Sequence, residues 1–159
     1  MNDQPILIAY DGSADARAAI DYAAELFPGA RAIVLHVRQP LESVAAHLEG
    51  HVALEELRNL DTATLDASAR VASEGAEYAS DRGLAAEAEI ASTVSAPSEA
   101  ILSAARDLDA RLVILGSRGR RGIAATLLGS TSTSVLHHAT RPTLVVPSAD
   151  VVRARNLAR

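Results

Sequence analysis

Residues 111–133 read RLVILGSRGRRGIAATLLGSTST. The short run at residues 111–115 ends on a glycine, which is typical of a strand buried on both faces. Glycines crowd the next stretch, and the hydroxyl residues 130–132 then open a helical pattern. Glycines let the backbone approach an anion closely, and free amides at a helix start point toward it. The loop also carries three arginines that would attract a polyphosphate: Arg118, Arg120 and Arg121.

The glycine spacing separates this loop from other phosphate-binding loops. A P-loop requires a lysine after its last glycine, and the chain contains no lysine. Gly116, Gly119 and Gly122 are one residue too widely spaced for a dinucleotide-binding fingerprint. The pattern Gly116-x2-Gly119-x9-Gly129-Ser130 instead resembles the ATP-binding motif of the universal stress protein family. The alternative is a strand-to-helix turn whose glycines only satisfy tight geometry.

The composition excludes several kinds of site. A chain of 159 residues is long enough for one domain with a full core. Its net charge is −5 and it has few aromatic residues, so we expect no nucleic-acid partner. It has no cysteine, which excludes disulfides, thiolate zinc sites and thiol nucleophiles. No run reaches membrane-spanning length and no signal-type start is present, so we expect a cytoplasmic protein without a membrane partner.

Apolar runs and helical patterns alternate along the chain. This alternation predicts an α/β fold with a five-stranded parallel sheet and helices on both faces. Ligands of such sheets bind beyond the carboxyl ends of the strands, where the turn at Asp11 and the loop at Gly116 could meet. We expect strands at residues 5–10, 30–37, 84–91, 111–115 and 143–146, and helices at residues 14–27, 41–82, 95–108 and 130–138.

Three histidines and the end of the chain have structural interpretations. His36 lies inside the second expected strand, and we expect a core histidine with one backbone partner. His47 and His51 are four residues apart but lack the HExxH order, so we expect a solvated helix face there. Residues 149–159 contain three arginines and no core pattern, so we expect a frayed tail.

The resemblance to the universal stress protein family covers residues 5–147. It implies a Rossmann-like domain of the adenine nucleotide alpha hydrolase-like type at residues 1–147, with a tail at 148–159 and with the first and fourth strands at the centre of the sheet. It also implies ATP as the ligand, with Mg²⁺ as an open addition. Carried over from the family motif, the nucleotide contacts fall on Ala9, Tyr10, Asp11, Val37, Gly116, Arg118, Gly119, Gly129, Ser130 and Thr131.

Two positions depart from the family pattern. Members often have a small residue or a Pro-Thr turn where this chain has Ala9 and Tyr10, so we expect Tyr10 to crowd the base or to stack on it. Ser95 replaces the glycine through which the third helix is often entered.

The candidate function is that of an ATP-binding regulator or sensor in a stress response. Beyond Asp11 no acid lies in the two loops, and no GxSxG motif or lysine nucleophile exists, so we favour a binding protein over an enzyme. Two alternatives stay open. One is a slow ATPase or an enzyme that phosphorylates itself on the hydroxyls of residues 130–134. The other is a dimeric scaffold that binds no nucleotide.

The last expected strand, Thr143–Val146, is a candidate dimer interface. It is short, apolar and uncharged, and it should lie at a sheet edge because it is the final element. Pro142 and Pro147 on either side would limit pairing to one short segment, which favours a closed homodimer. Members of the family are similar in pairing through this strand. The alternative is that residues 149–159 fold back and shield the edge.

Overall fold

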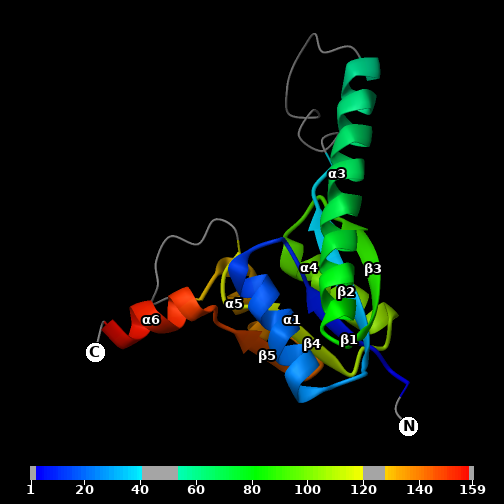
Figure 1. Cartoon of the computed structure of the whole chain (residues 1–159). Coiled ribbons are helices and arrows are strands. Elements are labelled where there is room, and N and C mark those ends of the chain that lie inside the picture. Colours follow the sequence, from blue (N-terminus) through cyan, green and yellow to red (C-terminus); the bar gives the residue numbers. More distant parts are fainter. Residues whose placement is uncertain (1–2, 41–53, 120–127, 158–159) are drawn as a thin grey trace.

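The computed structural model describes residues 3–40, 54–119 and 128–157 (Figure 1). Strands and helices alternate through these residues, which confirms the expected α/β class. The elements in chain order are β1 (Ile6–Ala9), α1 (Ala14–Leu26), β2 (Arg31–Arg38), α3 (Leu54–Asp81), β3 (Ala85–Ser92), α4 (Pro97–Asp107), β4 (Leu112–Gly116), α5 (Ser130–His138), β5 (Thr143–Val146) and α6 (Ala149–Leu157).

The five strands form one parallel sheet in the order β3-β2-β1-β4-β5. The first strand lies at the centre beside the fourth, as the family resemblance implied. Ile6 of β1 is in register with Ala32 of β2 on one side and with Leu112 of β4 on the other. Because β2 and β4 flank β1, the carboxyl ends of all three strands open onto the same edge of the sheet.

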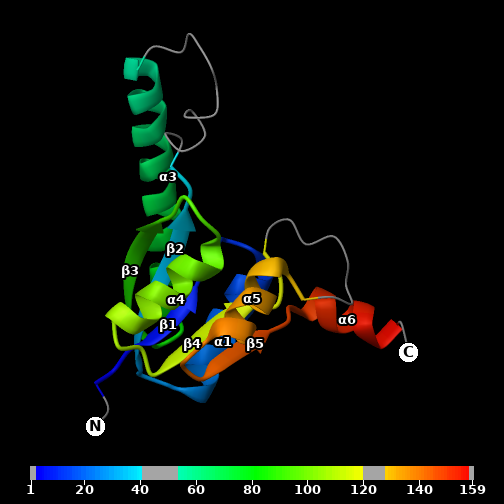
Figure 2. The ribbon, with the colours of Figure 1, turned by 180° about the vertical axis from the view of Figure 1, so that it is seen from behind.

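Helices cover both faces of the sheet, with α1 and α3 on one face and α4 and α5 on the other (Figures 1 and 2). Alternate residues of β1 supply the two cores. Ile6 and Ile8 pack toward α1 and α3, whereas Leu7 packs toward α4. All three side chains are fully buried, as expected for the central strand of a parallel sheet.

Single residues of particular types set the helix ends. Ser13 caps α1 by accepting a hydrogen bond from the Ala16 amide at 3.1 Å. Gly29, at φ +73°, provides the turn that separates α1 from β2. Pro97 stands in the first turn of α4, where its missing N–H costs nothing.

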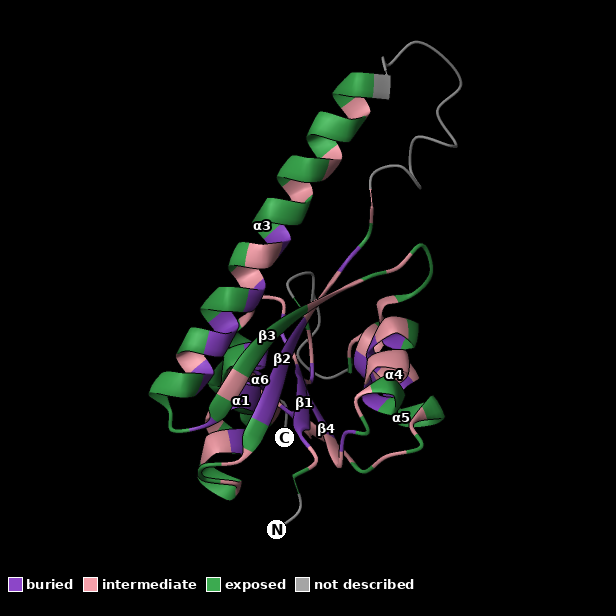
Figure 3. Ribbon diagram, turned by 90° about the vertical axis from the view of Figure 1, so that its right-hand side faces the viewer, coloured by how far each residue is buried: buried purple, intermediate pink, exposed green. Residues whose placement is uncertain are grey.

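Helix α3 is the longest element. Its span, Leu54–Asp81, confirms the later part of the helix expected at residues 41–82, and the earlier part, with His47 and His51, lies outside the described residues. The amino-terminal half of α3 extends beyond the sheet (Figure 3). Among residues 55–81, the buried ones lie in the half of the helix along the sheet.

The expectation of a frayed tail at residues 149–159 is wrong, because α6 occupies Ala149–Leu157. Val151 is 5% exposed and is the buried residue of this helix. The helix therefore has one buried side chain and not the periodic apolar face by which a helix is recognised in a sequence. Ser148 accepts the Val152 amide at 3.0 Å, and Asp150 pairs with Arg153. The helix extends away from the end of β5 and does not lie alongside that strand (Figures 1 and 2).

Among the described residues, no helix combines the length and the apolar character that crossing a membrane requires.

Candidate functional site

A cavity of about 550 Å³ lies at the carboxyl ends of β1, β2 and β4. This volume is within the range of small-molecule sites, about 300–1,000 Å³. All ten residues selected from the sequence line it: Ala9, Tyr10, Asp11, Val37, Gly116, Arg118, Gly119, Gly129, Ser130 and Thr131. Sequence reasoning did not select the remaining lining residues, Leu35, His36, Gln39, Pro97, Ile101, Leu115 and Ser132.

The β2 end of the cavity combines apolar side chains with main-chain groups that pair with no described strand. The pairing of β2 with β1 ends at Leu35, whose carbonyl accepts the Tyr10 amide at 2.8 Å. Main-chain groups of residues i and i+2 in a strand point the same way, so the N–H and C=O of Val37 also face the β1 side. No described strand pairs with them there. Val37 therefore offers one donor and one acceptor beside the apolar surface of Pro97 and Ile101.

The ring of Tyr10 does not lie where we expected it, against the base of the nucleotide. Its ring does not crowd or stack in the cavity, because it packs into the core on the α1 and α3 face and is 2% exposed. The hydroxyl donates to Glu74 Oε1 at 3.1 Å and receives Arg17 Nε at 3.4 Å. Burial raises the pKa of the Tyr10 hydroxyl, which keeps it a donor. Tyr10 therefore borders the cavity through its main chain.

His36 has one described backbone partner, as expected. Its Nδ1 lies 2.9 Å from the carbonyl oxygen of Tyr10. A carbonyl only accepts, so Nδ1 carries the proton and donates. The same residue also lines the cavity, which the assignment as a core histidine did not anticipate.

The Asp11 turn and the glycine loop meet, as expected. The Asp11 carboxylate accepts the Ser13 amide at 3.0 Å, and Gly12 takes φ +80° to turn the chain. A Cβ on Gly119 would lie 2.8 Å from Asp11 Oδ2. The glycine loop therefore packs directly against that carboxylate.

Asp15 and Ser117 hold the loop to α1, and sequence reasoning missed both. Asp15 Oδ2 accepts the Ser117 hydroxyl at 2.7 Å and the Arg118 amide at 3.0 Å, and both side chains are buried. A Cβ on Gly116 would lie 2.6 Å from the Cβ of Asp15, so Gly116 is needed for close packing of β4 against α1. An acid in a first helical turn normally indicates a favourable dipole contact, so the sequence alone carried no signal for this role.

The start of α5 is open toward the cavity. Its N-cap is Gly129, which makes no side-chain cap, and its first turn contains no acid. The Gly129 amide donates to the Ser117 carbonyl at 2.8 Å, and the Ser132 hydroxyl donates to the same carbonyl at 2.9 Å, so the helix start is fixed to the end of β4. Ser130 and Thr131 line the cavity at this point. The arrangement can bind an anion through main-chain amides.

Arg118 supplies the positive charge. It lines the main cavity and also a second cavity of about 410 Å³ next to α6. Its Nε and Nη2 are buried, and no described residue accepts a hydrogen bond from them. Gly122, Arg120 and Arg121 lie outside the described residues.

The acidic groups of the site are few among the described residues. Asp11 is the one carboxylate among the described residues that line the main cavity. The part of the chain that the structure describes contains no group of three or more residues that could hold a metal ion.

Comparisons with known proteins agree on one family. The model of the Universal stress protein family matches residues 3–147. "Universal stress protein YxiE" from Bacillus subtilis (strain 168) is 30% identical over 148 residues, which cover 89% of this chain and 97% of that protein. "Hypothetical protein MJ0577" has a similar solved structure, with a TM-score of 0.74, 23% identity and coverage of 92% of this chain and 97% of that one.

Two similar structures contain a nucleotide. One is a universal stress protein in complex with cAMP, with a TM-score of 0.61 at 23% identity, covering 91% of this chain and 96% of that chain. The other is the universal stress protein from Archaeoglobus fulgidus in complex with dAMP, with a TM-score of 0.55 at 20% identity, covering 90% of this chain and 97% of that chain.

Proposed function

The chain belongs to the universal stress protein family, and we propose that it binds an adenine nucleotide, ATP, in the cavity at the carboxyl ends of β1, β2 and β4. The observation that carries the proposal is the meeting of three features in one cavity: the Asp11 turn, the glycine loop and the open start of α5. The complexes of two structural relatives with cAMP and dAMP support an adenine nucleotide as the ligand class.

The two ends of the cavity match the two ends of a nucleotide. On the β2 side, Val37 presents a main-chain donor and acceptor next to apolar side chains. Adenine carries an amino donor beside a ring nitrogen acceptor, whereas guanine reverses this pattern, so Val37 favours adenine. On the β4 side, Arg118 and the first amides of α5 suit phosphates. ATP places more charge at this end than AMP does.

We propose a regulatory or sensing role in which binding, not turnover, is the activity. A hydrolase needs a group that positions or deprotonates the attacking water, and a metal held by protein ligands assists it. Asp11 is the one carboxylate among the described lining residues. Mg²⁺ would then be held mainly by the phosphates of the nucleotide and by water.

We also propose that the protein acts in the cytoplasm as a homodimer built on β5. This strand lies at one edge of the sheet, and α6 leaves its outer side open (Figure 2). An unpaired edge without charged side chains favours pairing with a second strand.

The binding proposal is tested by Gly129→Val with Thr133→Val as its control. A Cβ at Gly129 would meet its nearest atoms at ordinary contact distances of 3.4–3.5 Å, and we expect the two methyl groups of the valine to occupy the space that a phosphate needs. Thr133→Val places a β-branched side chain in the same helix, away from the cavity lining. We expect Gly129→Val to abolish binding of a fluorescent ATP analogue and Thr133→Val to retain it. Equal affinity in the two variants contradicts the placement of the phosphates.

A further inference from the structure

A glycine in the carboxyl-terminal half of α3 points to a role for this helix in the site. Gly75 lies well inside the helix, where a glycine costs about 1 kcal/mol relative to alanine. A Cβ built on it would lie 2.6 Å from Cδ1 of Tyr10 and 2.8 Å from Cγ1 of Val34. The missing side chain therefore forms a notch that the Tyr10 ring fills.

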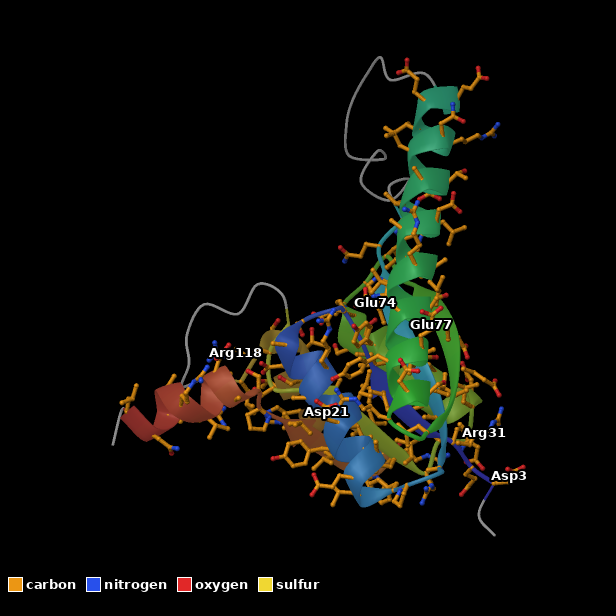
Figure 4. The ribbon with its side chains drawn as sticks, in the orientation of Figure 1. Asp3, Asp21, Arg31, Glu74, Glu77 and Arg118 are labelled. Carbon is orange, nitrogen blue, oxygen red and sulfur yellow. The ribbon has the colours of Figure 1, made fainter. Side chains whose placement is uncertain are left out.

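Tyr10 is fixed at both ends. Its amide donates to the Leu35 carbonyl, and its carbonyl accepts from His36 Nδ1. The hydroxyl at the far end of its ring donates to Glu74, which precedes Gly75 in α3 (Figure 4 labels Glu74 on this helix). Arg17 of α1 pairs with the same Glu74 oxygen at 2.6 Å. A rigid ring joined at both ends transmits a displacement of α3 to the main chain of Tyr10.

The main chain on either side of Tyr10 belongs to the site. Ala9 and Asp11 both line the cavity, and Asp11 carries the carboxylate that meets the glycine loop. Binding groups must be held to within roughly 0.5 Å of their productive geometry. We propose that Gly75 and Glu74 of α3 are positioning residues for the nucleotide site, acting from the far face of the sheet through the ring of Tyr10. This inference rests on the proposed function.

The decisive variant is Gly75→Ala. Its methyl group cannot coexist with the present place of the ring, since real Cβ contacts below 3.0 Å essentially do not occur. Alanine is at the same time the better helix former. We therefore expect the affinity for ATP and for AMP to fall by the same factor, about tenfold. The gain in helix propensity offsets part of the packing cost, so the melting temperature should fall only modestly. A role in packing alone predicts a lower melting temperature with unchanged affinity.

Two further variants separate positioning from general damage. Ala79→Gly lies one turn further along α3 at a fully buried position, so it weakens the helix and should leave affinity unchanged. Tyr10→Leu in the Gly75→Ala background gives the methyl group room, so we expect it to bind nucleotide more tightly than Gly75→Ala alone. Failure of this rescue, or a loss of affinity in Ala79→Gly as large as in Gly75→Ala, overturns the proposal.

A readout without nucleotide keeps the inference separate from the proposed function. His36 donates from Nδ1 to the Tyr10 carbonyl, so long-range proton–nitrogen NMR should show a protonated Nδ1 in the wild type and a shifted or lost signal in Gly75→Ala. If the wild type binds ATP and Gly75→Ala binds it equally well with an unchanged His36 signal, α3 does not position the site. If the wild type binds no nucleotide, the proposed function fails, and an unchanged His36 signal then also overturns the positioning by α3.

Discussion

Replacing Asp15 tests how the glycine loop is held against the sheet. Asp15 is 6% exposed and accepts the Ser117 hydroxyl at 2.7 Å and the Arg118 amide at 3.0 Å. In Asp15→Ala both donors lose their acceptor, and each unsatisfied buried donor costs about 1–3 kcal/mol. Loss of the negative charge in the first turn of α1 removes about 0.3–1 kcal/mol more. We expect the free energy of unfolding to fall by about 3–5 kcal/mol.

Urea titration and thermal melting measure this loss. For a chain of 159 residues, 1 kcal/mol corresponds to about 2–4 °C, so the melting temperature should fall by about 6–20 °C. Asp15→Asn keeps one carbonyl acceptor, and we expect about half of the effect. Glu25→Ala changes an exposed acid of the same helix and should stay within about 0.5 kcal/mol of the wild type.

The refuting result is an Asp15→Ala protein that melts within about 2 °C of the wild type. The loop would then be held without this carboxylate, and the explanation given for the buried hydroxyl of Ser117 would be wrong. A large effect of Glu25→Ala would also refute the explanation, because the melting temperature would then depend on the net charge of the protein and not on the contacts of Asp15.

Four further predictions concern the nucleotide, the chemistry, the dimer and pH. Arg118→Ala should weaken ATP about tenfold or more, as expected for a charged hydrogen bond, and change AMP much less, and equal losses in calorimetry would contradict its phosphate role. Phosphate release by the wild type should stay well below about one per second, and sustained release at or above that rate, lost in Asp11→Asn with binding retained, would make Asp11 catalytic. The carbonyls of Pro142 and Val146 accept hydrogen bonds from the β4 side, so the main chain of Val145, which points the other way, directs its amide to the open edge. Val145→Pro removes this donor and should convert a dimer to a monomer in sedimentation. An unchanged mass would exclude β5 as the interface. The Val145 side chain packs against the core, so a lysine there would disturb the fold as well. A hydrogen bond from Arg17, and to a lesser extent one from Tyr10, lowers the pKa of Glu74. The stability that the Glu74 carboxylate contributes is therefore complete above pH about 4.5 and is lost as the pH falls through the pKa of the folded state. On acid titration, Glu74→Gln should lose less stability than the wild type does.

The fold could be predicted because its signals are local. Apolar runs, prolines and glycines mark each strand and helix along the chain, and the alternation of strands and helices determines a parallel sheet. The strand order has no local signal and came from the family resemblance. Helix α6 was missed because one buried side chain, Val151, anchors it.

The site could be predicted as far as its motif extends. The glycines and Ser130 are recognisable by spacing, and they line the cavity. The groups that support them are not, because the partners are far apart in sequence: Asp15 and Ser117 are separated by 102 positions, and Tyr10 and Glu74 by 64. Tyr10 was assigned the wrong environment because the alternation of side chains along β1 continues past the end of the strand and turns its ring toward α3.

Calorimetric titration of ATP into the purified full chain tests the central claim most directly. We expect saturable binding with one nucleotide per chain, and weaker binding of GTP, because Val37 offers the main-chain pattern that complements adenine. Absence of heat together with an unchanged melting temperature at millimolar ATP would contradict the account, and GTP binding as tightly as ATP would contradict the role of Val37.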